Sequence, residues 1–383
     1  TSAYQREALD LGAEQFDWEA RRARSGQRRG SKVTGVAVGQ AYHAAGNNGY
    51  DGLLRIAPDG KLHIHTGVGN LGTFSYASTS RVAADVLDYD WDNVEIVRGD
   101  SSRGLPWTPS QSGSNTTFTE ARANYASAMD AVQKLKEIAA QDLGGSPEDY
   151  DVGSETVFSR ANPSRRLSYA AAAQRAVQLG GRFSGEEVPD DINEMTASAV
   201  EVIAGTGLIG VARDNIPRTG TVPALAAGFI EIELDVETGQ FEIIDYLGVV
   251  DCGTVLHPLG LSGQIKGGAV MGFGMAALER HVYDTHYGLP GTVGFHQTKP
   301  PTYLDVPLEM EWSAVGIADP QNPVGVKGIG EPTMGCAAAA LLCAISDALG
   351  GHYFNRSPIV PDMIVNAASG RPQSHTPLQV HSQ

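Results

Sequence analysis

The sequence predicts an α+β protein in which two lobes each combine strands with helices. Strand pairs around a turn are indicated twice, at residues 53–65 and again at residues 227–250. In each half, a glycine-rich segment and a helical segment follow the strand pair. The chain has 383 residues, which is long enough to build two hydrophobic cores. The two halves are alike in architecture, without a repeat of fixed period.

Residues 1–48 are expected to form an N-terminal arm. They are mostly polar and charged and include five arginines between Arg21 and Arg29. A basic run of this kind is usually a solvated face, and the alternative is an arm that docks on an acidic partner. Because the stretch offers little apolar surface, we expect it to become ordered mainly by lying on another subunit.

Residues 49–147 are expected to form the first lobe. Alternating apolar residues on both sides of Pro58-Asp59-Gly60 are typical of a hairpin, and the Ala-rich stretch that ends this lobe has helical spacing. The expected elements are strands at 53–56, 62–65 and 93–97 and helices at 78–87 and 119–142.

Residues 148–200 are expected to connect the lobes, and residues 201–370 to form the second lobe. The connection contains one predicted helix, at 168–179. The second lobe has a strong hairpin signal around Glu237-Thr238-Gly239, followed by small residues at helical spacing. Its expected elements are strands at 227–234 and 241–250 and helices at 263–278 and 336–349. The tail, residues 371–383, is expected to fray.

Composition excludes several classes of protein. The formal net charge is −16, which disfavours nucleic acid or an anionic membrane as a partner. The three cysteines, Cys252, Cys336 and Cys343, form no C-x-x-C pair, so neither a structural zinc site nor an iron–sulfur cluster is expected in this chain. No apolar run is long enough to predict a membrane span, and no signal peptide is visible. The chain does not begin with Met, so we expect a processed chain or part of a longer protein.

Two patterns have competing interpretations. Gly67, Gly69 and Gly72 match the G-x-G-x-x-G dinucleotide fingerprint, with Asp88 near the place of the ribose acid. Because this motif follows a hairpin, a nucleotide-binding dehydrogenase is the weaker hypothesis. His63 and His65 share one face of a strand and could begin a metal site, but a packed pair is expected because no third ligand lies nearby in the sequence.

The segment Gly325-Val326-Lys327-Gly328-Ile329-Gly330-Glu331-Pro332 has clearer chemical meaning. It places the Glu331 carboxylate on a glycine-rich turn that leads into an Ala-rich helix. Glycines let the backbone approach a bulky ligand, and partial burial raises the pKa of a carboxylate toward the range that suits a general base. The alternative is a structural Glu that is favoured at a helix N-terminus by the macrodipole.

Further segments share an order with a known family. In the second half they are Asp251-Cys252-Gly253, His257-Pro258, Gly263-Gln264, Gly267-Gly268 and Gly272-Phe273-Gly274, and in the first half Thr66-Gly67, Leu71-Gly72, Gly99-Asp100 and Ser112-Gly113-Ser114. Together with Lys327–Glu331 this order resembles the molybdenum-binding subunit of the xanthine dehydrogenase/aldehyde oxidase family of molybdenum hydroxylases. The resemblance extends over about residues 29–364.

The resemblance implies two α/β lobes of a molybdopterin-binding domain, present as a separate subunit. It implies that Glu331 is the general base toward a water activated by molybdenum, and that the substrate is an aldehyde or an electron-poor N-heterocycle oxidised with water as the oxygen source. The residues implied to bind the cofactor are Gly72, Thr73, Phe74, Ser112, Gly113, Ser114, Gln264, Met271, Lys327 and Gly330. No protein ligand to the metal is expected, because the pterin dithiolene holds molybdenum.

The resemblance also implies an assembly. The pterin is expected in its cytosine dinucleotide form, with iron–sulfur clusters and FAD only on partner chains. The expected partners are a second molybdopterin-domain subunit, an iron–sulfur subunit and a flavin subunit, alongside the small-molecule substrate. A cytoplasmic location is expected, or a periplasmic one if a partner carries the export signal.

Two positions depart from the family pattern. Thr73 stands where many relatives have a cofactor-binding Gln, and Met271 also replaces a Gln. Each lost amide hydrogen bond is worth roughly 1 kcal/mol. Either the cofactor is held differently, or Phe74 reshapes the substrate space, or this subunit has weakened chemistry. Two alternative functions remain on the same scaffold: an aryl-CoA-type reductase, and a degenerate subunit without catalysis, for which Thr73 and Met271 are the evidence.

Overall fold

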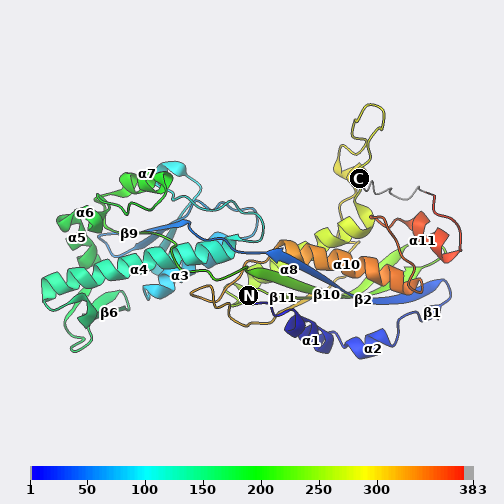
Figure 1. The fold of residues 1–383 in the computed structure, drawn as a ribbon, viewed down its shortest axis with the longest axis horizontal. Helices are drawn as coiled ribbons and strands as arrows, with labels where there is room; N and C mark the ends of the chain where they lie inside the picture. Colours follow the sequence, from blue (N-terminus) through cyan, green and yellow to red (C-terminus); the bar gives the residue numbers. More distant parts are fainter. Residues whose placement is uncertain (1, 375–383) are drawn as a thin grey trace. The chain divides into compact units, whose positions relative to one another are not determined.

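A computed structural model describes residues 2–374 of the chain as two compact units. Unit 1 comprises Ala45–Val222 and Ala318–Gly328, and unit 2 comprises Ser2–Ala44, Pro223–Ile317 and the chain from Ile329 onward. Both units mix helices and strands, which confirms the α+β prediction (Figure 1). Within residues 2–374, no helix has the length and apolar character needed to cross a membrane.

Unit 1 is built on a four-stranded sheet in the order β5-β4-β3-β9. The predicted hairpin is present as β3 (Asp51–Ile56) and β4 (Leu62–His65), which pair antiparallel. β4 is parallel to β5 (Val94–Val97), and helix α3 (Ser75–Val86) connects these two strands. β9 (Leu208–Arg213), which the sequence did not predict, pairs with the other side of β3.

Helices cover both faces of this sheet. The long helix α4 (Thr116–Leu143) packs with α3 over Leu54, Ile64 and neighbouring apolar residues. On the other face, α7 (Glu194–Ile203) packs on Leu53 and Ile209. The remaining elements of unit 1 are β6 (Tyr150–Gly153), β7 (Thr156–Ser159) and β8 (Arg166–Ser168), which form a small sheet, and helices α5 (Tyr169–Leu179) and α6 (Gly181–Ser184).

Unit 2 is built on a five-stranded sheet in the order β1-β2-β10-β11-β12. The second predicted hairpin is present as β10 (Pro223–Asp235) and β11 (Phe241–Asp251). β10 pairs along its whole length with β2 (Lys32–Ala44), so it is the central strand and is buried on both faces. The edge strands are β1 (Arg28–Arg29) and β12 (Glu311–Ala314).

Helices α8 (Pro258–Phe273) and α10 (Glu331–Ala348) cover one face of this sheet (Figure 1). α10 lies in backbone contact with β2, because a Cβ on Gly39 would stand 2.2 Å from the Cys336 carbonyl oxygen. A Cβ on Gly35 would stand 2.2 Å from the Ala344 carbonyl oxygen. Strand and helix can approach this closely because glycine has no side chain. A π-helical turn, Gly274–Leu278, extends α8, and α9 (Phe295–Thr298) and α11 (Pro361–Ala368) are the remaining helices of unit 2.

The N-terminal arm is ordered on its own chain, which corrects the expectation that another subunit orders it. Helices α1 (Gln5–Gln15) and α2 (Trp18–Arg22) lie on the face of the unit 2 sheet opposite α8 and α10. Ala8 and Phe16 pack there against Phe229 and Val249. The sequence did not show this, because the apolar residues of the arm are few and widely spaced.

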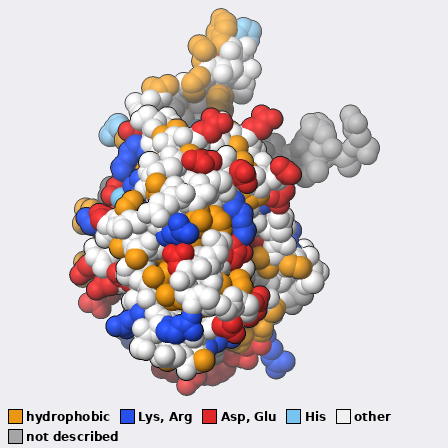
Figure 2. Space-filling view, turned by 90° about the vertical axis from the view of Figure 1, so that its left-hand side faces the viewer, with side chains coloured by type: hydrophobic (Ala, Val, Ile, Leu, Met, Phe, Trp, Pro, Cys, Tyr) orange, Lys and Arg blue, Asp and Glu red, His pale blue; other side chains and the backbone are white. Residues whose placement is uncertain are grey.

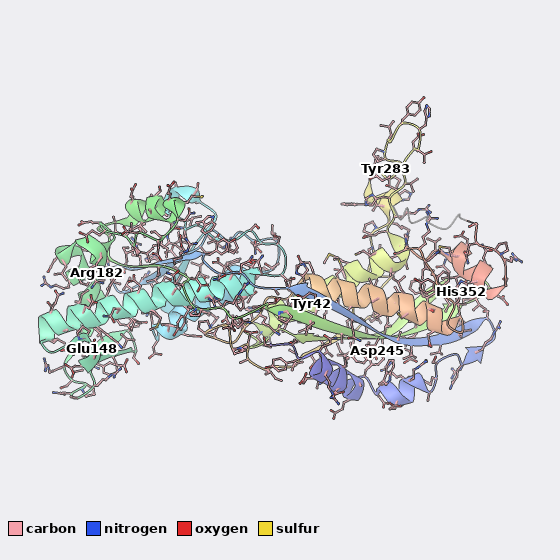
Figure 3. The ribbon with its side chains drawn as sticks, in the orientation of Figure 1. Tyr42, Glu148, Arg182, Asp245, Tyr283 and His352 are labelled. Carbon is pink, nitrogen blue, oxygen red and sulfur yellow. The ribbon has the colours of Figure 1, made fainter. Side chains whose placement is uncertain are left out.

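Three of the five arginines between Arg21 and Arg29 are paired with carboxylates of unit 2, whereas Arg28 and Arg29 are exposed, as expected for a solvated face. Arg21 and Arg24 each donate to Glu231 at 2.8 Å, and Arg21 also pairs with Asp245, which is labelled in Figure 3. Arg22 pairs with Asp347 of α10 at 2.7 Å. The acidic partner of the arm is therefore unit 2 itself.

The compact units divide the chain at other places than the expected lobes. The stretch expected as an arm, residues 1–48, contributes β2 to the unit 2 sheet, and the expected connection, residues 148–200, lies within unit 1. Residues 318–328 belong to unit 1 although the second lobe was expected to contain them. Of the expected tail, residues 375–383 lie outside the described residues.

Candidate functional site

Two loops of unit 1 carry the residues expected to bind the cofactor. One leads from β4 to α3 and contains Gly72, Thr73 and Phe74, and the other precedes α4 and contains Ser112, Gly113 and Ser114. The backbone is left-handed at Gly72, Phe74, Gly113 and Ser114, with φ between 53° and 88°. Left-handed backbone at Phe74 and Ser114 is unfavourable for residues with a side chain, and such strain clusters at functional sites.

Gln111 joins the two loops. Its Nε2 donates to Ser75 Oγ at 2.7 Å and to Thr73 Oγ1 at 3.2 Å, and the two hydroxyls are themselves 3.1 Å apart. These bonds bring the Thr73 side chain next to the residue that precedes Ser112. The sequence did not single out Gln111, because its contact with Thr73 spans 38 positions.

Gly328 contributes a third segment to the same unit. A Cβ on Gly328 would stand 1.6 Å from the Ser114 carbonyl oxygen, so only glycine permits this approach. Lys327, which precedes it, is 1% exposed. A buried ammonium needs hydrogen-bond partners, and the contact of Lys327 with a cofactor stays a prediction.

Glu331 is the first residue of α10 in unit 2, and its side chain is half-buried. Pro332 follows it, in the first helical turn where proline is favoured. Two residues after Glu331, Thr333 Oγ1 lies 2.6 Å from the Gly330 carbonyl oxygen and 3.1 Å from the Gln264 carbonyl oxygen on α8. The first turn of α10, with Glu331, is thereby fixed against the helix that carries Gln264.

Helix α8 presents Gln264 and Met271 on one side. Ile265 and Phe273 of α8 are buried in the core of unit 2, whereas Gly267 and Met271 are exposed, and Met271 is 54% exposed. Residues 264, 267 and 271 follow at helical spacing, so they share a face. A Cβ on Gly267 would meet nothing within 4 Å, which leaves room for a ligand to approach the helix backbone.

His257 has a structural role in unit 2. Its Nδ1 accepts a hydrogen bond from the Gly260 backbone N–H at 2.8 Å and caps α8, and Pro258 takes the first helical position. The His-Pro motif of the sequence is therefore a helix start signal.

The segments expected to hold the cofactor share one property of their helix ends. Helices α3, α4 and α10 begin after Phe74, Asn115 and Gly330, and none of these residues makes a side-chain capping bond. Helices α5, α7 and α8 are capped by the side chains of Ser168, Asn193 and His257. Helices α1, α2, α6, α9 and α11 have no side-chain cap either, so this property alone does not distinguish the expected site. A helix N-terminus that no side chain caps presents backbone N–H groups that suit an anionic ligand.

The dinucleotide hypothesis does not fit the local structure. β4, α3 and β5 do form a parallel strand–helix–strand unit, although the motif follows a hairpin. However, a Cβ on Gly67 would stand 2.7 Å from the Pro106 carbonyl oxygen, so Gly67 allows a close contact within the protein. Asp88 accepts a hydrogen bond from the Ser154 backbone N–H at 2.6 Å and therefore stabilises a turn of the chain.

The histidine pair is packed, as expected. His65 is 3% exposed, its Nδ1 is 2.8 Å from the Gly104 carbonyl oxygen, and burial lowers its pKa to about 4. His63 Nδ1 lies 3.3 Å from Glu95. Among residues 2–374, no group of three or more His, Cys, Asp or Glu side chains is arranged to hold a metal ion.

A buried carboxyl group that the sequence analysis missed lies on α4. Glu120 is 2% exposed, its Oε2 accepts from Thr66 Oγ1 at 3.3 Å, and its Oε1 has no hydrogen-bond partner among the described residues. Burial raises the pKa of Glu120 to about 8. Glu120 follows the Ser112–Ser114 loop by less than two helical turns, but no sequence motif marks it.

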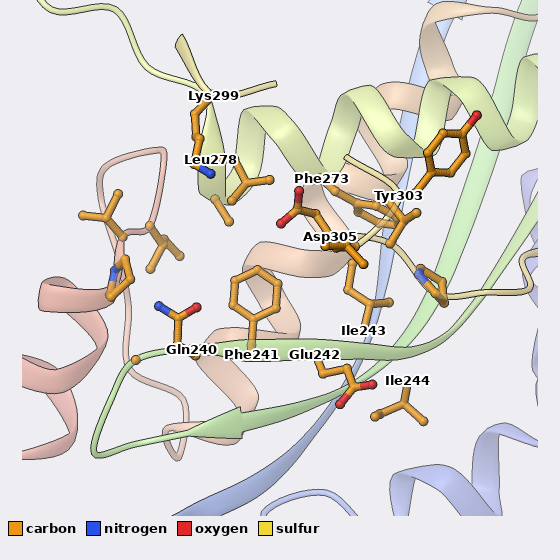
Figure 4. A pocket seen from close by; sticks show the side chains of 18 of the residues that line it. Gln240, Phe241, Glu242, Ile243, Ile244, Phe273, Leu278, Lys299, Tyr303 and Asp305 are labelled. Carbon is orange, nitrogen blue, oxygen red and sulfur yellow. The ribbon is translucent and has the colours of Figure 1, made fainter. Parts of the chain in front are cut away.

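A cavity of unit 2 is separate from these residues. It has a volume of about 1270 Å³ and lies between the start of β11 and the extended segment around Tyr303 and Asp305 (Figure 4). His296 lines it, whereas His281 and His286 are exposed loop residues. None of the residues expected to bind the cofactor lines this cavity.

The face drawn in Figure 2 is mixed in charge. Acidic and basic side chains are interspersed with apolar ones on it. This face therefore lacks the basic stripe that nucleic-acid binding requires.

Comparison with known proteins identifies the family. A model of the molybdopterin cofactor-binding domain matches residues 11–307, which is most of the chain. The chain belongs to the molybdopterin cofactor-binding domain family. The resemblance to molybdenum-binding subunits of the xanthine dehydrogenase/aldehyde oxidase family is thus confirmed.

Individual relatives agree with this assignment. The chain is 27% identical over 368 residues to the 6-hydroxypseudooxynicotine dehydrogenase complex subunit gamma of Paenarthrobacter nicotinovorans, covering 95% of this chain and 43% of the relative. It is 26% identical over 348 residues to an aldehyde oxidoreductase molybdenum-binding subunit of Escherichia coli (strain K12), covering 90% and 42%. This molybdopterin cofactor-binding chain therefore spans less than half the length of these relatives.

Solved structures share the fold. Quinoline 2-oxidoreductase from Pseudomonas putida 86 matches with a TM-score of 0.76 and 24% identity, over 95% of this chain and 46% of that one. Carbon monoxide dehydrogenase from Oligotropha carboxidovorans matches with a TM-score of 0.78 and 19% identity, over 96% and 45%. The α+β architecture of this molybdopterin cofactor-binding chain is therefore that of molybdenum hydroxylases.

Proposed function

We propose that this chain is the molybdopterin-binding part of a heteromeric molybdenum hydroxylase that oxidises an aldehyde or an electron-poor N-heterocycle. The observation that carries the proposal is the match of the molybdopterin cofactor-binding family model to residues 11–307, and the uncapped helix ends after Phe74, Asn115 and Gly330 are compatible with it. A pterin with phosphate groups is an anion, and uncapped helix N-termini are suited to bind anions.

The residues present fit such a cofactor. Gly328 lies against the Ser114 carbonyl oxygen, and Gly267 leaves the backbone of α8 open to a large planar group. In unit 1 we assign Gly72, Thr73, Phe74 and the Ser112–Ser114 loop to cofactor binding. In unit 2 we assign Gln264, Met271 and Gly330 to it.

When bound, molybdenum would activate a water molecule as the nucleophile and accept electrons from the substrate. Glu331 would take up the proton that this water gives up. Glu331 is half-buried at the first position of α10, and a carboxylate is a side chain that can serve as a general base. The contact of Thr333 Oγ1 with the Gln264 carbonyl oxygen keeps the start of α10 in place while this occurs.

The wider assembly belongs to the same proposal. The names of two relatives, a complex subunit gamma and a nicotine 6-hydroxylase large subunit, support an enzyme of several chains. We propose a second molybdopterin-domain chain, an iron–sulfur subunit and a flavin subunit as partners, with the pterin in its cytosine dinucleotide form. We further propose a cytoplasmic complex.

The test is to purify the protein, with any chains that co-purify, from a host that makes molybdopterin. Molybdenum and pterin are measured per chain, and turnover is measured with a panel of aldehydes and azaheterocycles. Glu331→Gln should leave metal and pterin content unchanged and lower turnover by about 100-fold or more. Glu237→Gln, at an exposed carboxylate of the same unit, is the matched control.

Three results would contradict the proposal. Absence of molybdenum and pterin from the purified complex would favour the degenerate scaffold, for which Thr73 and Met271 are the evidence. Near-normal turnover of Glu331→Gln would remove Glu331 as the base. Reduction of an aryl-CoA, without oxidation of any aldehyde or heterocycle, would favour the reductase.

A further inference from the structure

We propose that Gln111 is a cofactor-binding residue whose carboxamide, held between the two loops of unit 1, contacts the polar edge of bound molybdopterin. This inference rests on the proposed function. Gln111 is the residue directly before the Ser112–Ser114 loop, and its Nε2 reaches Thr73 and Ser75 on the other loop.

The three side chains form one hydrogen-bonded cluster. Gln111 Nε2 lies 2.7 Å from Ser75 Oγ and 3.2 Å from Thr73 Oγ1, and these hydroxyl oxygens are 3.1 Å apart. Each contact is within hydrogen-bond range, so the end of the Gln111 side chain is fixed in position. A carboxamide that is already fixed in this way loses less conformational entropy when it binds a ligand.

The position of the cluster is suited to ligand contact. Gln111 and Thr73 are both half-buried, whereas Ser75 is buried beneath them at the first position of α3. The bonds to Ser75 and Thr73 use the amide nitrogen. The carboxamide also has a carbonyl oxygen, and a Cβ on Gly69 would stand 3.9 Å from it, so Gly69 does not crowd this oxygen. A pterin ring carries both donors and acceptors at its edge, which a carboxamide can match.

The chain has no carboxamide at position 73, where the family resemblance leads us to expect one. Gln111 Nε2 lies 3.2 Å from Thr73 Oγ1, so Gln111 supplies an amide directly beside position 73. The structure therefore offers a physical reason why Thr73 need not weaken cofactor binding.

The experiment measures pterin and molybdenum per chain in the protein purified with its co-purifying chains. Gln111→Ala should lower pterin retention by about tenfold, from the loss of one buried amide hydrogen bond and the loop bridge. Gln133→Ala, which removes a glutamine bonded to Glu137 on the exposed side of α4, should retain the pterin of the unaltered protein. Melting temperature is measured alongside, and Gln111→Met, which keeps the side-chain length, serves if Gln111→Ala unfolds.

The double variant Gln111→Ala/Thr73→Gln distinguishes a direct contact of Gln111 with the cofactor from a purely structural role in joining the two loops. If the amide contacts the cofactor, the second substitution should restore at least half of the lost pterin. Loss that Thr73→Gln does not restore would show that Gln111 only braces the loops, and full retention by Gln111→Ala would also overturn the inference. A lack of pterin in the unaltered protein would overturn the proposed function itself, so the two failures are distinguishable.

Discussion

The α-carbon of Gly328 lies so close to Ser114 that a Cβ on Gly328 would stand 1.6 Å from the Ser114 carbonyl oxygen. These residues are more than 200 positions apart, yet the segment before Glu331 and the loop before α4 form one packed layer in unit 1. Because Ser114 itself has left-handed backbone, the loop has little freedom to move away from an added methyl group.

Gly328→Ala should therefore displace this loop. We expect the free energy of unfolding to fall by about 1–3 kcal/mol, as for other overpacked positions, and pterin content to fall with it. Urea unfolding and pterin analysis measure the two effects. Gly69→Ala is the unfolding control, because its Cβ would make only an ordinary contact at 3.9 Å. Equal stability of the two variants would show that the contact with Ser114 relaxes.

Glu120 should make stability depend on pH. Its pKa is raised by burial from 4.5 to about 8, so the folded protein holds a proton that the unfolded chain releases. Stability from this group is present below about pH 4.5 and is lost as the pH rises through 8, at up to about 1.4 kcal/mol per pH unit.

Glu120→Gln should remove this loss. Relative to the unaltered protein, the variant should gain unfolding free energy between pH 5 and pH 8. Urea midpoints at several pH values give the difference between the two proteins. The low pKa of His65 acts in the opposite sense but is common to both proteins, so it cancels. Parallel pH profiles would rule out a buried protonated Glu120.

His257→Ala should uncap α8. Loss of the 2.8 Å bond to the Gly260 N–H should cost about 1 kcal/mol of unfolding free energy and should loosen the turn that leads to Gln264. Ser168→Ala removes a comparable cap from α5 in unit 1 and should cost a similar amount without changing pterin content. His257→Asn should restore the cap. If all of these variants keep the pterin content of the unaltered protein, the cap of α8 does not affect cofactor binding.

Glu231→Gln should release the N-terminal arm. Glu231 accepts from both Arg21 and Arg24 and is itself buried, so its loss leaves two arginines without their shared partner. We expect trypsin to cleave after residues 21–24 at least several-fold faster than in the unaltered protein. Glu233→Gln, which disturbs only an exposed pair with Lys32, should leave the cleavage rate unchanged. The same rate in both variants would indicate that apolar packing alone holds the arm.

The elements that the sequence predicted are those with strong local signals. The hairpin β10–β11 has two apolar runs around Thr238-Gly239, and α4 has long helical periodicity, so both were found. Strand β2 was missed because Gly35 and Gly39 and several alanines weaken its apolar alternation, and its structure depends on pairing with β10, which lies about 190 positions later. The arm was misjudged for a similar reason, because its partner surface is formed by distant strands.

The residues of the candidate site likewise fall into those that a local motif predicted and those that only the structure revealed. Glu331 and Gln264 were found because glycine-rich motifs surround them in the sequence. Gln111 and Glu120 were not, because neither stands in a motif and each acquires its meaning from a contact with Thr73 or Thr66. Expectations about Lys327 depend on burial, which a sequence pattern does not reveal for a single charged residue.

The glycines of β2 have a consequence for the placement of Glu331. Gly35 and Gly39 are four strand residues apart, about 13 Å, and they meet Ala344 and Cys336, which are eight helix residues apart, about 12 Å. The spacing of the two glycines along β2 therefore matches the spacing of the two α10 residues that they contact. Because β2 contacts the α10 backbone at two separate glycines, the position of α10 along the strand, and with it that of Glu331, depends on both contacts. A change at Gly35, about 20 Å along the helix from Glu331, would on this basis shift the carboxylate without touching it.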